Sequence, residues 1–592
     1  MIMELMELLR EKISEVIKKS YKLDMTSDEI DVSHPGNELW GDYSTNIAMR
    51  LSKEVKQTPT EIAKKLSYEL SQDSHAWQID GVECEMFEKI DFQDPGFINF
   101  TLSEKFLTAA ALTSDEKLES QKGNLNIGQY RGRNVLFEYT DPNPFKVFHI
   151  GHLMTNTLGE ALSRMYEISG ANVKRVNYQG DVGLHVAKSI WGVLKKPLPL
   201  DDKVGFFADG YVMGEKAYET DPKSKDEIHQ LNYLIYIAAQ ERLQKEENWK
   251  PVVDYKKFLN ESHTFSYEEV KELYEKGRKW SLEHFEKMYK ILGTKFDAYY
   301  FESMVGEYGL KIVNDNLGKG VFKKDEGAII FPGEKYGLHT RVFVNSFGLP
   351  TYEAKDLGLA ILKSESFDYD LSFIITANEV DEYFKVVLKA MEQIKPDLAA
   401  KTVHIGHGVM RFKEGKMSSR TGEIVSAEEF IEDVKKMVSE PQAIGAIKYS
   451  ILKQGMGKDI IFDKNQSVSI TGNTGPYLQY THARANSILE KAPKWSYNEA
   501  PATFQEREKN VLRHLVRFHD ILSFALLNNS PNLICEYLFE LAQRYNALYN
   551  DLQILKEPNE QAKILRLQIT KQVRDLLKTG LWILGIEAPE RV

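Results

Sequence analysis

A chain of 592 residues is too long for a single hydrophobic core, because such cores stop growing near roughly 250 to 300 residues, so we expect three or four domains. Its 42% hydrophobic and 28% charged residues exclude a fibrous repeat or a mainly disordered chain and predict a soluble globular protein. The net charge of -11 argues mildly against a partner bound mainly through phosphate groups, although it leaves room for a local basic groove.

The cysteines and the hydropathy pattern bear on where the protein works. Only Cys84 and Cys535 occur, far apart in the sequence, so we expect neither a disulfide framework nor a zinc site built on thiolates. The first residues are apolar but interrupted by charges, which is typical of an amphipathic helix and not of a signal peptide. No run is long and apolar enough to span a bilayer. We therefore expect a cytoplasmic protein with no membrane partner.

Residues 1–115 are predicted to form a small α+β domain. Helical patterns occupy most of this region, and the strand-like run Gly96-Phe97-Ile98-Asn99-Phe100 lies near its end. The polar stretch from Ser114 to Arg133 contains several turn-forming residues and is predicted to be a linker.

Residues 130–440 are predicted to form a Rossmann-type domain. An apolar run at 134–139 is followed by a loop at 140–144, a long helical pattern at 152–166 and a second apolar run at 173–178. Strand, loop, helix and strand in this order predict a βαβ unit, and such units bind nucleotides at the carboxyl edge of a parallel sheet.

Later segments complete the expected fold class, which is multidomain α/β plus all-α. A stretch rich in lysine, glutamate and tyrosine, at about 198–295, is predicted to be a helical insertion. Strand-like runs at 327–331, 341–344 and 373–376 are expected to complete the nucleotide-binding sheet. Helical patterns dominate residues 441–592, which predicts a C-terminal helix bundle.

The tetrapeptide His149-Ile150-Gly151-His152 lies between the first predicted strand and its helix, where backbone N–H groups and the helix dipole favour an anion. Its two imidazoles can donate hydrogen bonds to phosphate oxygens. Gly151 lets the backbone come close to a nucleotide, because it has no Cβ. Lys146 adds a positive charge at the same place. The motif therefore predicts a nucleotide site.

The same tetrapeptide occurs again as His404-Ile405-Gly406-His407, so the motif alone is a weak signal. Context separates the two copies, because only the first precedes an uninterrupted helical pattern. The second lies in a strand-like stretch that runs into a glycine-containing loop. We interpret the second copy as mainly structural, with a position lining the adenine side as the alternative.

Residues 411–422 form a basic segment flanked by glycines, with Lys416-Met417-Ser418-Ser419-Arg420 at its centre. Such a loop suits closure over a triphosphate as an electrostatic stabiliser. The alternative is a solvated surface loop. Its place after a full set of predicted strands favours the functional interpretation.

These two motifs, in this order, resemble the signatures of class I aminoacyl-tRNA synthetases, and the surrounding residues are similar to the arginyl family. That family carries a glutamate after the strand, a Pro-Asn element and a lysine three residues before the histidine motif. This chain matches with Glu138, Asn143 and Lys146. In the family this lysine is thought to replace the second lysine of the lysine-methionine-serine-lysine-serine loop, and Ser419 occupies that loop position here.

The resemblance implies a reaction in two steps. Arginine attacks the α-phosphorus of ATP, supplied with Mg²⁺, to give arginyl-adenylate, and the 3′-terminal adenosine of tRNA(Arg) then takes the arginyl group. The enzyme positions its substrates and stabilises charge, uses no required covalent nucleophile or protein-bound structural metal, and activates arginine only with tRNA bound. We expect a monomer. The implied catalytic residues are Lys146, His149, His152 and Lys416, and the implied ATP-binding residues are His149, Gly151, His152, Lys416 and Ser418.

Arginine selection requires a carboxylate that accepts a guanidinium through two hydrogen bonds. Tyr352 and Asp356 are one helical turn apart and would face the same way. They match the guanidinium-binding tyrosine and aspartate of the family, while Glu138 and Asn143 match residues on the opposite wall. A surface role for Tyr352 and Asp356 is the alternative.

One position departs from the family pattern. Relatives often carry an amino-acid-contacting glutamine where this chain has Val380. Glu379 or Asp381 is a candidate replacement for the contact to the α-amino group.

Both ends of the chain resemble tRNA-binding parts of the arginyl family. The N-terminal region is similar to the family's extra domain at the tRNA elbow, and its predicted contacts are Phe97 and Asn99. The C-terminal region is similar to the helical anticodon-binding domain, and Tyr477, Tyr480 and Tyr545 would stack on unpaired bases there. Without the resemblance these tyrosines would be interpreted as core residues. Val592 stands where the family usually ends in methionine.

The sequence carries features that disfavour three rival functions. A cysteine or glutamine enzyme of the same class is disfavoured, because two distant cysteines cannot form the former's zinc site and the pair Tyr352 and Asp356 suits a cationic substrate. A non-catalytic tRNA-binding relative would be expected to lose the first histidine motif, Lys416 or the pocket acid. A small-molecule adenylyltransferase would not need the helical C-terminal third.

Overall fold

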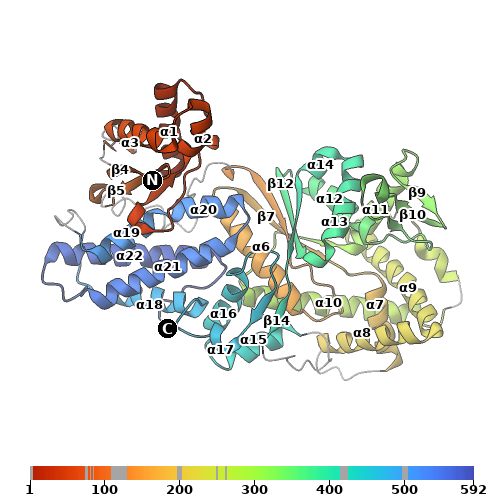
Figure 1. Cartoon of the computed structure of the whole chain (residues 1–592). Helices are drawn as coiled ribbons and strands as arrows, with labels where there is room; N and C mark the ends of the chain where they lie inside the picture. The colour runs from red at the N-terminus through yellow and green to blue at the C-terminus, as the bar shows by residue number, and fades with distance from the viewer. Residues whose placement is uncertain are drawn as a thin grey trace. The chain divides into compact units, whose positions relative to one another are not determined.

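The structure is a computed structural model that describes residues 5–73, 78–79, 82–83, 86–107, 130–196, 203–247, 251, 253–260, 263–413, 425–496 and 504–591. Contacts between Cα atoms divide the chain into two compact units. One comprises residues 130–167 and 171–468, and the other comprises residues 1–129, 168–170 and 469–592. In Figure 1 the first unit runs from orange through green to cyan, and the second is red and blue.

A parallel sheet forms the centre of the first unit. Among the described residues its strand order is β13-β12-β6-β7-β8, and all neighbouring strands are parallel. Later strands are added on both sides of β6, which creates the switch point at which Rossmann-type sheets bind ligands. The predicted Rossmann-type fold is confirmed. The strands are β6 (Asn134–Glu138), β7 (Asn172–Gln179), β8 (Ala298–Phe301), β12 (Leu371–Ala377) and β13 (Thr402–His407).

Helix α6 (Ile150–Ile168) connects β6 to β7 and is buried along most of its length. It packs closely because Gly159 faces Tyr139, the residue that follows β6. A Cβ on Gly159 would lie 2.2 Å from the Tyr139 ring. The Tyr139 hydroxyl also donates a 2.6 Å hydrogen bond to Glu160 of the helix. These contacts hold the middle of α6 against the residue that follows β6.

Two of the predicted strands belong to a different sheet, and that part of the prediction is wrong. The segments predicted at 327–331 and 341–344 form β10 (Ala328–Phe331) and β11 (Arg341–Val344), which pair antiparallel with each other. β10 also pairs with β9 (Lys323–Asp325). The connection between β10 and β11 is too short for the crossover that a parallel pair requires, so a hairpin results. The sheet partner that the sequence did not reveal is β8.

The predicted helical insertion consists of long helices packed on α7 (Leu184–Lys195). Its core is apolar and includes Ile190, Ile228 and Leu231. Glycine allows α7 and α8 to touch, because a Cβ on Gly192 would lie 2.1 Å from the carbonyl oxygen of Gly210. The helices are α8 (Lys203–Thr220), α9 (Pro222–Glu247) and α10 (Tyr267–Leu292), with a 3-10 turn at Tyr255–Asn260.

Further helices and two short strands follow in this unit, and the last helix ends at Ser467. Apolar residues of α11, α12 and α13 form one core with Leu136 and Val176 of the parallel sheet and Phe331 of β10. The elements are α11 (Glu302–Leu317), α12 (Tyr352–Ser366), α13 (Asp381–Ile394), α14 (Pro396–Ala400), β14 (Met410–Phe412), α15 (Ala427–Lys435), α16 (Glu440–Leu452), β15 (Ile460–Phe462) and α17 (Lys464–Ser467), with 3-10 turns at Gly333–Tyr336 and Asn378–Val380.

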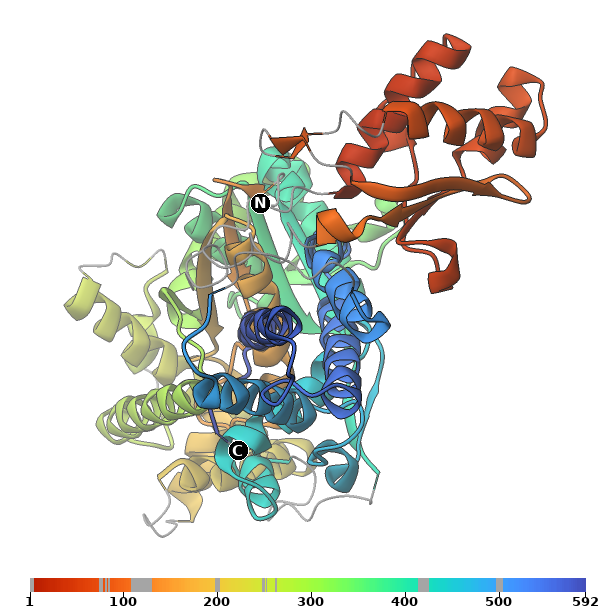
Figure 2. The same cartoon turned by 90° about the vertical axis from the view of Figure 1, so that its left-hand side faces the viewer.

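The N-terminal part of the second unit is an α+β domain, as predicted. An antiparallel sheet in the order β1-β5-β4 packs against helices, and Figure 2 shows the helices on one side of this sheet. Leu9, Ile13, Leu66 and Phe100 are among its buried core residues. The elements are α1 (Leu5–Tyr21), β1 (Tyr43–Thr45), α2 (Ile47–Val55), α3 (Pro59–Asp73), β2 (Gln78–Ile79), β3 (Val82–Glu83), β4 (Phe87–Gln93) and β5 (Phe97–Leu102), with 3-10 turns at Ser27–Glu29 and Glu38–Trp40.

The C-terminal part of the same unit is a bundle of helices, as predicted. Tyr43 of the N-terminal domain donates a 2.8 Å hydrogen bond to Asp520 of the bundle. Inside the bundle, the buried Arg566 donates a 2.7 Å bond to the buried Glu508. The helices are α18 (Gly475–Lys491), α19 (Glu506–Val516), α20 (Phe518–Leu527), α21 (Pro531–Asp551) and α22 (Glu560–Ile583).

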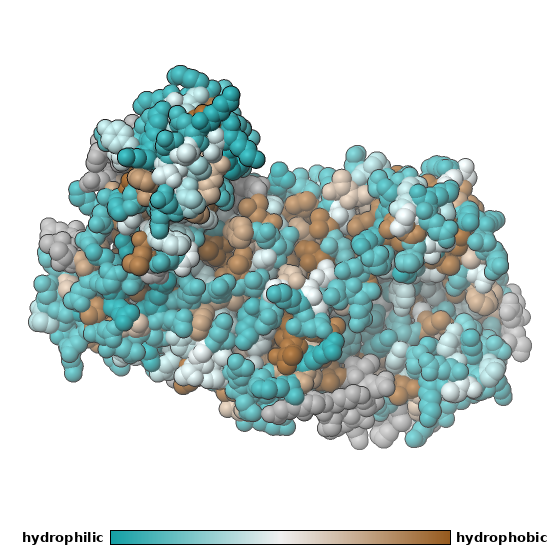
Figure 3. Space-filling view, viewed as in Figure 1, coloured by the Kyte–Doolittle hydropathy of each residue, from teal (hydrophilic) through white to brown (hydrophobic). Residues whose placement is uncertain are grey.

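The surface view in Figure 3 shows hydrophobic side chains as small groups between hydrophilic ones. No helix in the described part of the chain is both long and apolar enough to cross a membrane.

Candidate active site

The first histidine motif begins α6 at the carboxyl edge of the parallel sheet, and its two imidazole rings are stacked. Their centroids lie 3.7 Å apart, with 21° between the ring planes. The backbone N–H of His149 donates to Nδ1 of His152 at 3.2 Å, and the N–H of Gly151 donates to Nδ1 of His149 at 3.0 Å. Because Nδ1 is an acceptor in both rings, the proton of each neutral imidazole resides on Nε2.

Both histidines are neutral in the free protein. Burial, and secondarily the charge of Lys146, lowers the pKa of His149 to about 4. Burial first, and then the charges of His149 and Lys146, place the pKa of His152 well below its usual value. The two rings can therefore offer Nε2–H donors to an anion without carrying charge themselves.

The structure gives a local reason why position 151 is a glycine, and it differs from the expected one. A Cβ at this position would lie 2.8 Å from Cε1 and 2.9 Å from Nδ1 of His149. The ring of His149 folds back over the glycine to accept its N–H, so any larger residue would displace that ring. The role of this glycine in close approach of a nucleotide stays a prediction.

Two residues shortly after the basic segment, Val425 and Ser426, contact the first histidine motif. His149 forms an isolated antiparallel bridge with Ser426, and Ile150 N–H donates to the carbonyl oxygen of Val425 at 3.2 Å. Residues 414–424 lie outside the described residues, so Lys416 and Ser418 stay predictions. The chain that follows them is nevertheless attached to the first histidine motif.

The loop between β6 and α6 carries unusual backbone angles. Thr140, Asp141 and Phe145 have positive φ values of 81°, 44° and 69°, which are rare for residues other than glycine. Hydrogen bonds hold the loop in place, because Asp141 accepts from the N–H of Tyr178 at 2.7 Å and Phe145 N–H donates to Ser281 at 2.9 Å. Such conformations cluster at functional sites, where the surrounding structure enforces them.

The same loop presents Asn143 and Lys146. The side-chain oxygen of Asn143 lies 2.2 Å from the position that a Cβ of Gly180 would occupy, so glycine is required there. The ammonium group of Lys146 lies 4.4 Å from the ring centroid of Tyr211 in the helical insertion. Burial lowers the pKa of Lys146 from its usual value. Both residues are thus anchored by segments distant in sequence.

Acidic side chains that are fully or partly buried gather near this loop. They come from the end of β6, the following loop, the start of α11 and the first turns of α12. Among the described residues, Lys363 pairs with Glu138, and Lys355 pairs with Glu302. The two acids of this group without a lysine partner in the described ranges are Asp141 and Asp356, and a cationic ligand beside them would favour their ionised forms. The acidic residues are Glu138, Asp141, Glu302 and Asp356.

Asp356 is the titratable acid of this group. Burial, and secondarily the charges of Glu138 and Glu302, raises the pKa of Asp356 to about 7, although the hydroxyl of Tyr383 donates to it. Burial places the pKa of Asp141 well above its usual value, and the charge of Glu138 adds to the effect. A bound cation would favour the ionised form of these carboxyls.

A buried hydroxyl in this region has no hydrogen-bond partner among the described residues. It belongs to Tyr178 of β7, and the charges of Glu302 and Asp356 contribute to raising its pKa. A buried polar group without a partner costs free energy, so it indicates a place where a ligand or water completes the hydrogen bonding.

The predicted pair Tyr352 and Asp356 lies one turn apart on α12, as the spacing required. The side chain of Tyr352 is 56% exposed, and the ammonium of Lys355 lies 5.1 Å from its ring centroid. Asp356 is half-buried. The structure therefore brings together Glu138, Asn143 and Asp356, with Tyr352 at the solvent edge of α12.

The segment around Val380 includes Asp381, one of the two residues predicted to replace the family's amino-acid-contacting glutamine. Val380 is partly exposed, and Asp381 begins α13. An oxygen of Asp381 lies 2.2 Å from the position of a Gly406 Cβ and 3.7 Å from Nδ1 of His404. Asp381 therefore faces β13, and its role toward an amino acid stays a prediction.

The second histidine motif lies on β13, where its rings join neighbouring elements. His404 lies 2.7 Å from the hydroxyl of Thr376 and stacks on Phe384 with the ring centroids 4.1 Å apart. Nε2 of His407 lies 2.9 Å from the hydroxyl of Thr155 on α6. These contacts give the second motif a packing role in the sheet.

Two predicted tRNA contacts are not available at the surface. Tyr545 is 0% exposed and its hydroxyl donates to Thr570 of α22, so it is a core residue and not a stacking platform. Asn99 is 4% exposed, and its side-chain oxygen accepts from Ser44 at 2.7 Å. Phe97 is 39% exposed and can meet a partner.

Tyr549 was not among the tRNA contacts predicted from the sequence. It is one turn beyond Tyr545 and is 41% exposed. The guanidinium of Arg484 lies 5.0 Å from the Tyr549 ring centroid and 4.7 Å from that of the half-buried Tyr480. Tyr477, also half-buried, accepts a 2.9 Å bond from Asn546. An exposed aromatic ring beside an arginine is a surface that suits unpaired bases.

No group of three or more His, Cys, Asp or Glu side chains within the described ranges is arranged to hold a metal ion. A central parallel sheet with a histidine motif at its switch point is the arrangement of a class I aminoacyl-tRNA synthetase, and the catalytic-domain family of that class matches this part of the chain.

Sequence comparisons narrow this assignment. Residues 115–444, more than half of the chain, match the family described as tRNA synthetases class I (R), catalytic domain. Residues 7–102 match the arginyl tRNA synthetase N terminal domain, and residues 478–592 match the DALR anticodon binding domain. The chain belongs to the arginyl-tRNA synthetase family of class I.

Curated relatives and solved structures agree over the full length. The chain is 28% identical to the arginine–tRNA ligase of Flavobacterium psychrophilum, with 100% of both chains covered, and 27% identical to that of Clostridium beijerinckii, with 98% and 100% covered. The Thermus thermophilus arginyl-tRNA synthetase has a similar fold, with a TM-score of 0.75, 23% identity and 99% and 100% coverage. The Plasmodium falciparum enzyme gives a TM-score of 0.74 at 21% identity, with 100% and 99% covered.

Proposed function

We propose that this enzyme ligates L-arginine to tRNA(Arg) through an arginyl-adenylate and requires bound tRNA to form it. The observation that carries the substrate assignment is the buried acidic group next to the first histidine motif. Asp356, which has no ion pair among the described residues, would supply the negative charge for a guanidinium. Glu302 would add carboxylate oxygens already held by Lys355, and Tyr178 would add a hydroxyl that has no partner in the described part of the chain. A guanidinium offers five N–H donors in a planar fork and can bond one carboxylate through two of them, which the ammonium of lysine cannot do with the same geometry.

ATP would be held on the other side of the loop between β6 and α6. His149 and His152 would donate to its phosphate oxygens as neutral groups, and Lys146 would supply positive charge. Mg²⁺ would arrive with the triphosphate. Lys416 and Ser418 would act from the loop that returns beside His149. These groups position reactants and stabilise charge, so the reaction needs no covalent enzyme intermediate. We also propose that the enzyme acts as a cytoplasmic monomer.

The test of the proposed function is arginine-dependent exchange of labelled pyrophosphate into ATP, measured with and without unfractionated tRNA. The other amino acids are measured in parallel as controls. We expect exchange with arginine alone, and only when tRNA is present. Exchange driven by another amino acid would overturn the substrate assignment, and silence with every amino acid would favour a non-catalytic RNA-binding role.

The titration of Asp356 predicts a pH dependence of arginine binding. Its pKa is about 7 in the free enzyme, and a bound guanidinium requires the ionised form. Below pH 7 binding must therefore release a proton, so the KM for arginine should rise about tenfold in all between pH 8 and pH 6, with most of the rise below pH 7. Steady-state kinetics between pH 6 and 8 would measure this, with the KM for ATP as the control. An arginine KM that does not change with pH would contradict the prediction.

Tyr549 and Tyr545 form a matched pair for tRNA binding, because they lie one turn apart on α21. Tyr549→Ala should raise the KM for tRNA about tenfold or more, since one base stack contributes about 1–3 kcal/mol, and should leave the melting temperature nearly unchanged. Tyr545→Ala should instead destabilise the bundle by about 3–5 kcal/mol, as expected for a buried aromatic residue. Aminoacylation kinetics and thermal melts would separate the two effects. The reverse pattern would show that Tyr545 contacts the RNA.

A further inference from the structure

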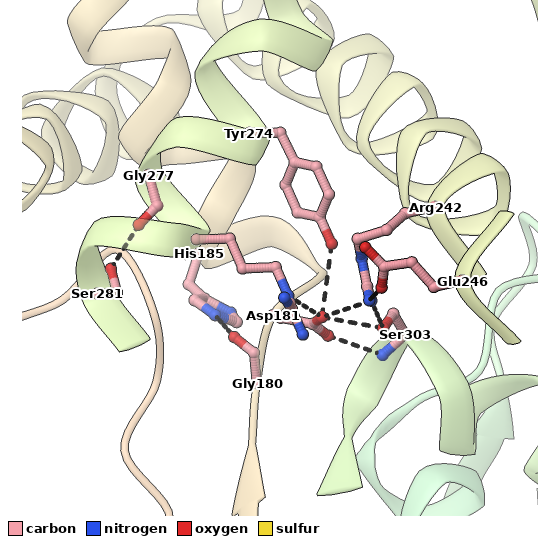
Figure 4. Close-up of polar contacts among 10 residues, drawn as sticks. Gly180, Asp181, His185, Arg242, Glu246, Tyr274, Gly277, Ser281 and Ser303 are labelled. Atoms are coloured by element: carbon pink, nitrogen blue, oxygen red, sulfur yellow. Dashed lines mark hydrogen bonds and ion pairs between the residues drawn. The ribbon is translucent and has the colours of Figure 1, made fainter. Parts of the chain in front are cut away.

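A buried carboxylate just past β7 joins the helical insertion to the rest of the catalytic unit. Asp181 is fully buried, and its side chain accepts hydrogen bonds from several elements (Figure 4). Its Oδ1 accepts from the N–H of Ser303 at 2.9 Å, and its Oδ2 accepts from the Ser303 hydroxyl at 2.9 Å. Nε of Arg278 donates to Oδ2 at 2.9 Å, and Nη2 of Arg242 donates at 3.3 Å.

The arginines come from different helices of the insertion. Arg242 lies on α9 and Arg278 on α10, and both converge on Asp181 as Figure 4 shows for the labelled Arg242. Tyr274, also on α10, points its hydroxyl toward the same carboxylate at 3.5 Å. The network therefore binds two long helices of the insertion to the carboxyl edge of the parallel sheet.

The other side of this network is the segment Phe301-Glu302-Ser303. The guanidinium carbon of Arg278 lies 4.2 Å from the ring centroid of Phe301, and Nη2 of Arg242 donates to the hydroxyl of Ser303 at 3.1 Å. Both neighbours of Glu302 in the chain are therefore held in place. Arg278 contacts Phe301, and Asp181 and Arg242 bond Ser303. The carboxylate of Glu302 itself pairs with Lys355 in the buried acidic group.

The residue before Asp181 also belongs to the proposed arginine site. A Cβ on Gly180 would lie 2.2 Å from the side-chain oxygen of Asn143 and 2.9 Å from Oε1 of Glu302. The carbonyl oxygen of Gly180 accepts from Nε2 of His185 at 2.7 Å. Asp181 therefore fixes the strand end that contacts Asn143 as well as the helix that begins with Glu302.

We propose that the helical insertion sets the affinity for arginine, with Arg242, Arg278 and Asp181 as positioning residues for Glu302. This inference rests on the proposed function, because it assigns Glu302 to the arginine site. The insertion does not touch arginine in this scheme. It holds Phe301 and Ser303 so that the Glu302 carboxylate keeps its place beside Lys355, and a displacement of the order of 1 Å at such a site weakens binding strongly.

The test replaces Arg278, which can be changed while the buried Asp181 keeps Arg242 as a counter-charge. In Arg278→Met we expect the KM for arginine in tRNA-dependent pyrophosphate exchange to rise about tenfold, with the KM for ATP changed less than twofold. Arg278→Lys restores the charge but not the planar stack on Phe301 or the Nε donor, so it should recover only part of the affinity. Equilibrium dialysis with labelled arginine gives the same comparison without turnover.

Glu246→Gln is the matched control, because the half-exposed Glu246 pairs with Arg242 and is absent from the contacts to Asp181. It should leave the KM for arginine within twofold of the parent enzyme. If Arg278→Met lowers kcat while the KM and the dissociation constant for arginine stay unchanged, or if Arg278→Lys binds arginine no better than Arg278→Met, the proposal is overturned. Failure of the parent enzyme to exchange with arginine would instead refute the proposed function.

Discussion

Replacing Asp356 with asparagine should raise the KM for arginine by about a hundredfold or more. The substitution keeps the shape of the side chain and removes the negative charge that a guanidinium needs. Losing a charged hydrogen-bond partner in a buried site costs about 3 kcal/mol or more, which corresponds to at least about a hundredfold in affinity. Pyrophosphate exchange with varied arginine would measure it, and the KM for ATP should change by less than threefold.

Tyr383→Phe provides the control for this substitution. It removes the hydroxyl that donates to Asp356 and leaves the carboxylate in place. Without that donor the pKa of Asp356 should move further above 7, because the Tyr383 hydrogen bond now holds it down. The KM for arginine should therefore rise only a few-fold, and mostly below pH 8. If Asp356→Asn affects arginine no more than Tyr383→Phe does, Asp356 does not bind the guanidinium.

The sequence predicted the parts of the site whose signal is local. The run that became β6, the helical pattern that became α6 and the motif between them are contiguous, so their arrangement follows from strand, loop and helix. Lys146 was predicted because it lies in that same loop, whereas Asn143 was predicted only through the resemblance to the arginyl family. The fold class could be predicted for the same reason, since each domain carries a distinct periodicity.

What the sequence could not give depends on contacts between distant segments. The strand β8 has only the residues Ala298–Phe301, which is too short for a clear pattern. It pairs with β7, although the whole helical insertion separates the two strands in the sequence. Glu302 follows directly after β8, so missing the strand meant missing the acid at its carboxyl end. The error at β10 and β11 has a different origin, because their short connection is local in the sequence and favours an antiparallel hairpin over places in a parallel sheet.

Helix faces posed a second difficulty. Tyr545 and Tyr549 share one side of α21 by their spacing, yet only Tyr545 is covered by α22. Helical periodicity gives the spacing of residues on a face but not the edge at which burial ends, which depends on the neighbouring helix. Asn99 is similar, because its alternation on β5 did not reveal Ser44 as its partner.

Replacing His152 with alanine should lower kcat for pyrophosphate exchange by about a hundredfold to a thousandfold, the usual loss when one donor to a developing charge is removed. The KM for arginine should change less than threefold, because the acidic group stays intact. Since the pKa of His149 is about 4 and that of His152 is also lowered, neither ring should add a protonation step to the parent rate between pH 6 and 8.

The second copy of the motif provides a control within the same chain. His404→Ala removes a ring that stacks on Phe384, so it should lower the melting temperature and leave kcat within a few-fold of the parent value. Equal losses of kcat in both variants would mean that the stacked pair at the start of α6 has no special role in stabilising the phosphate, and that the two tetrapeptides are both structural.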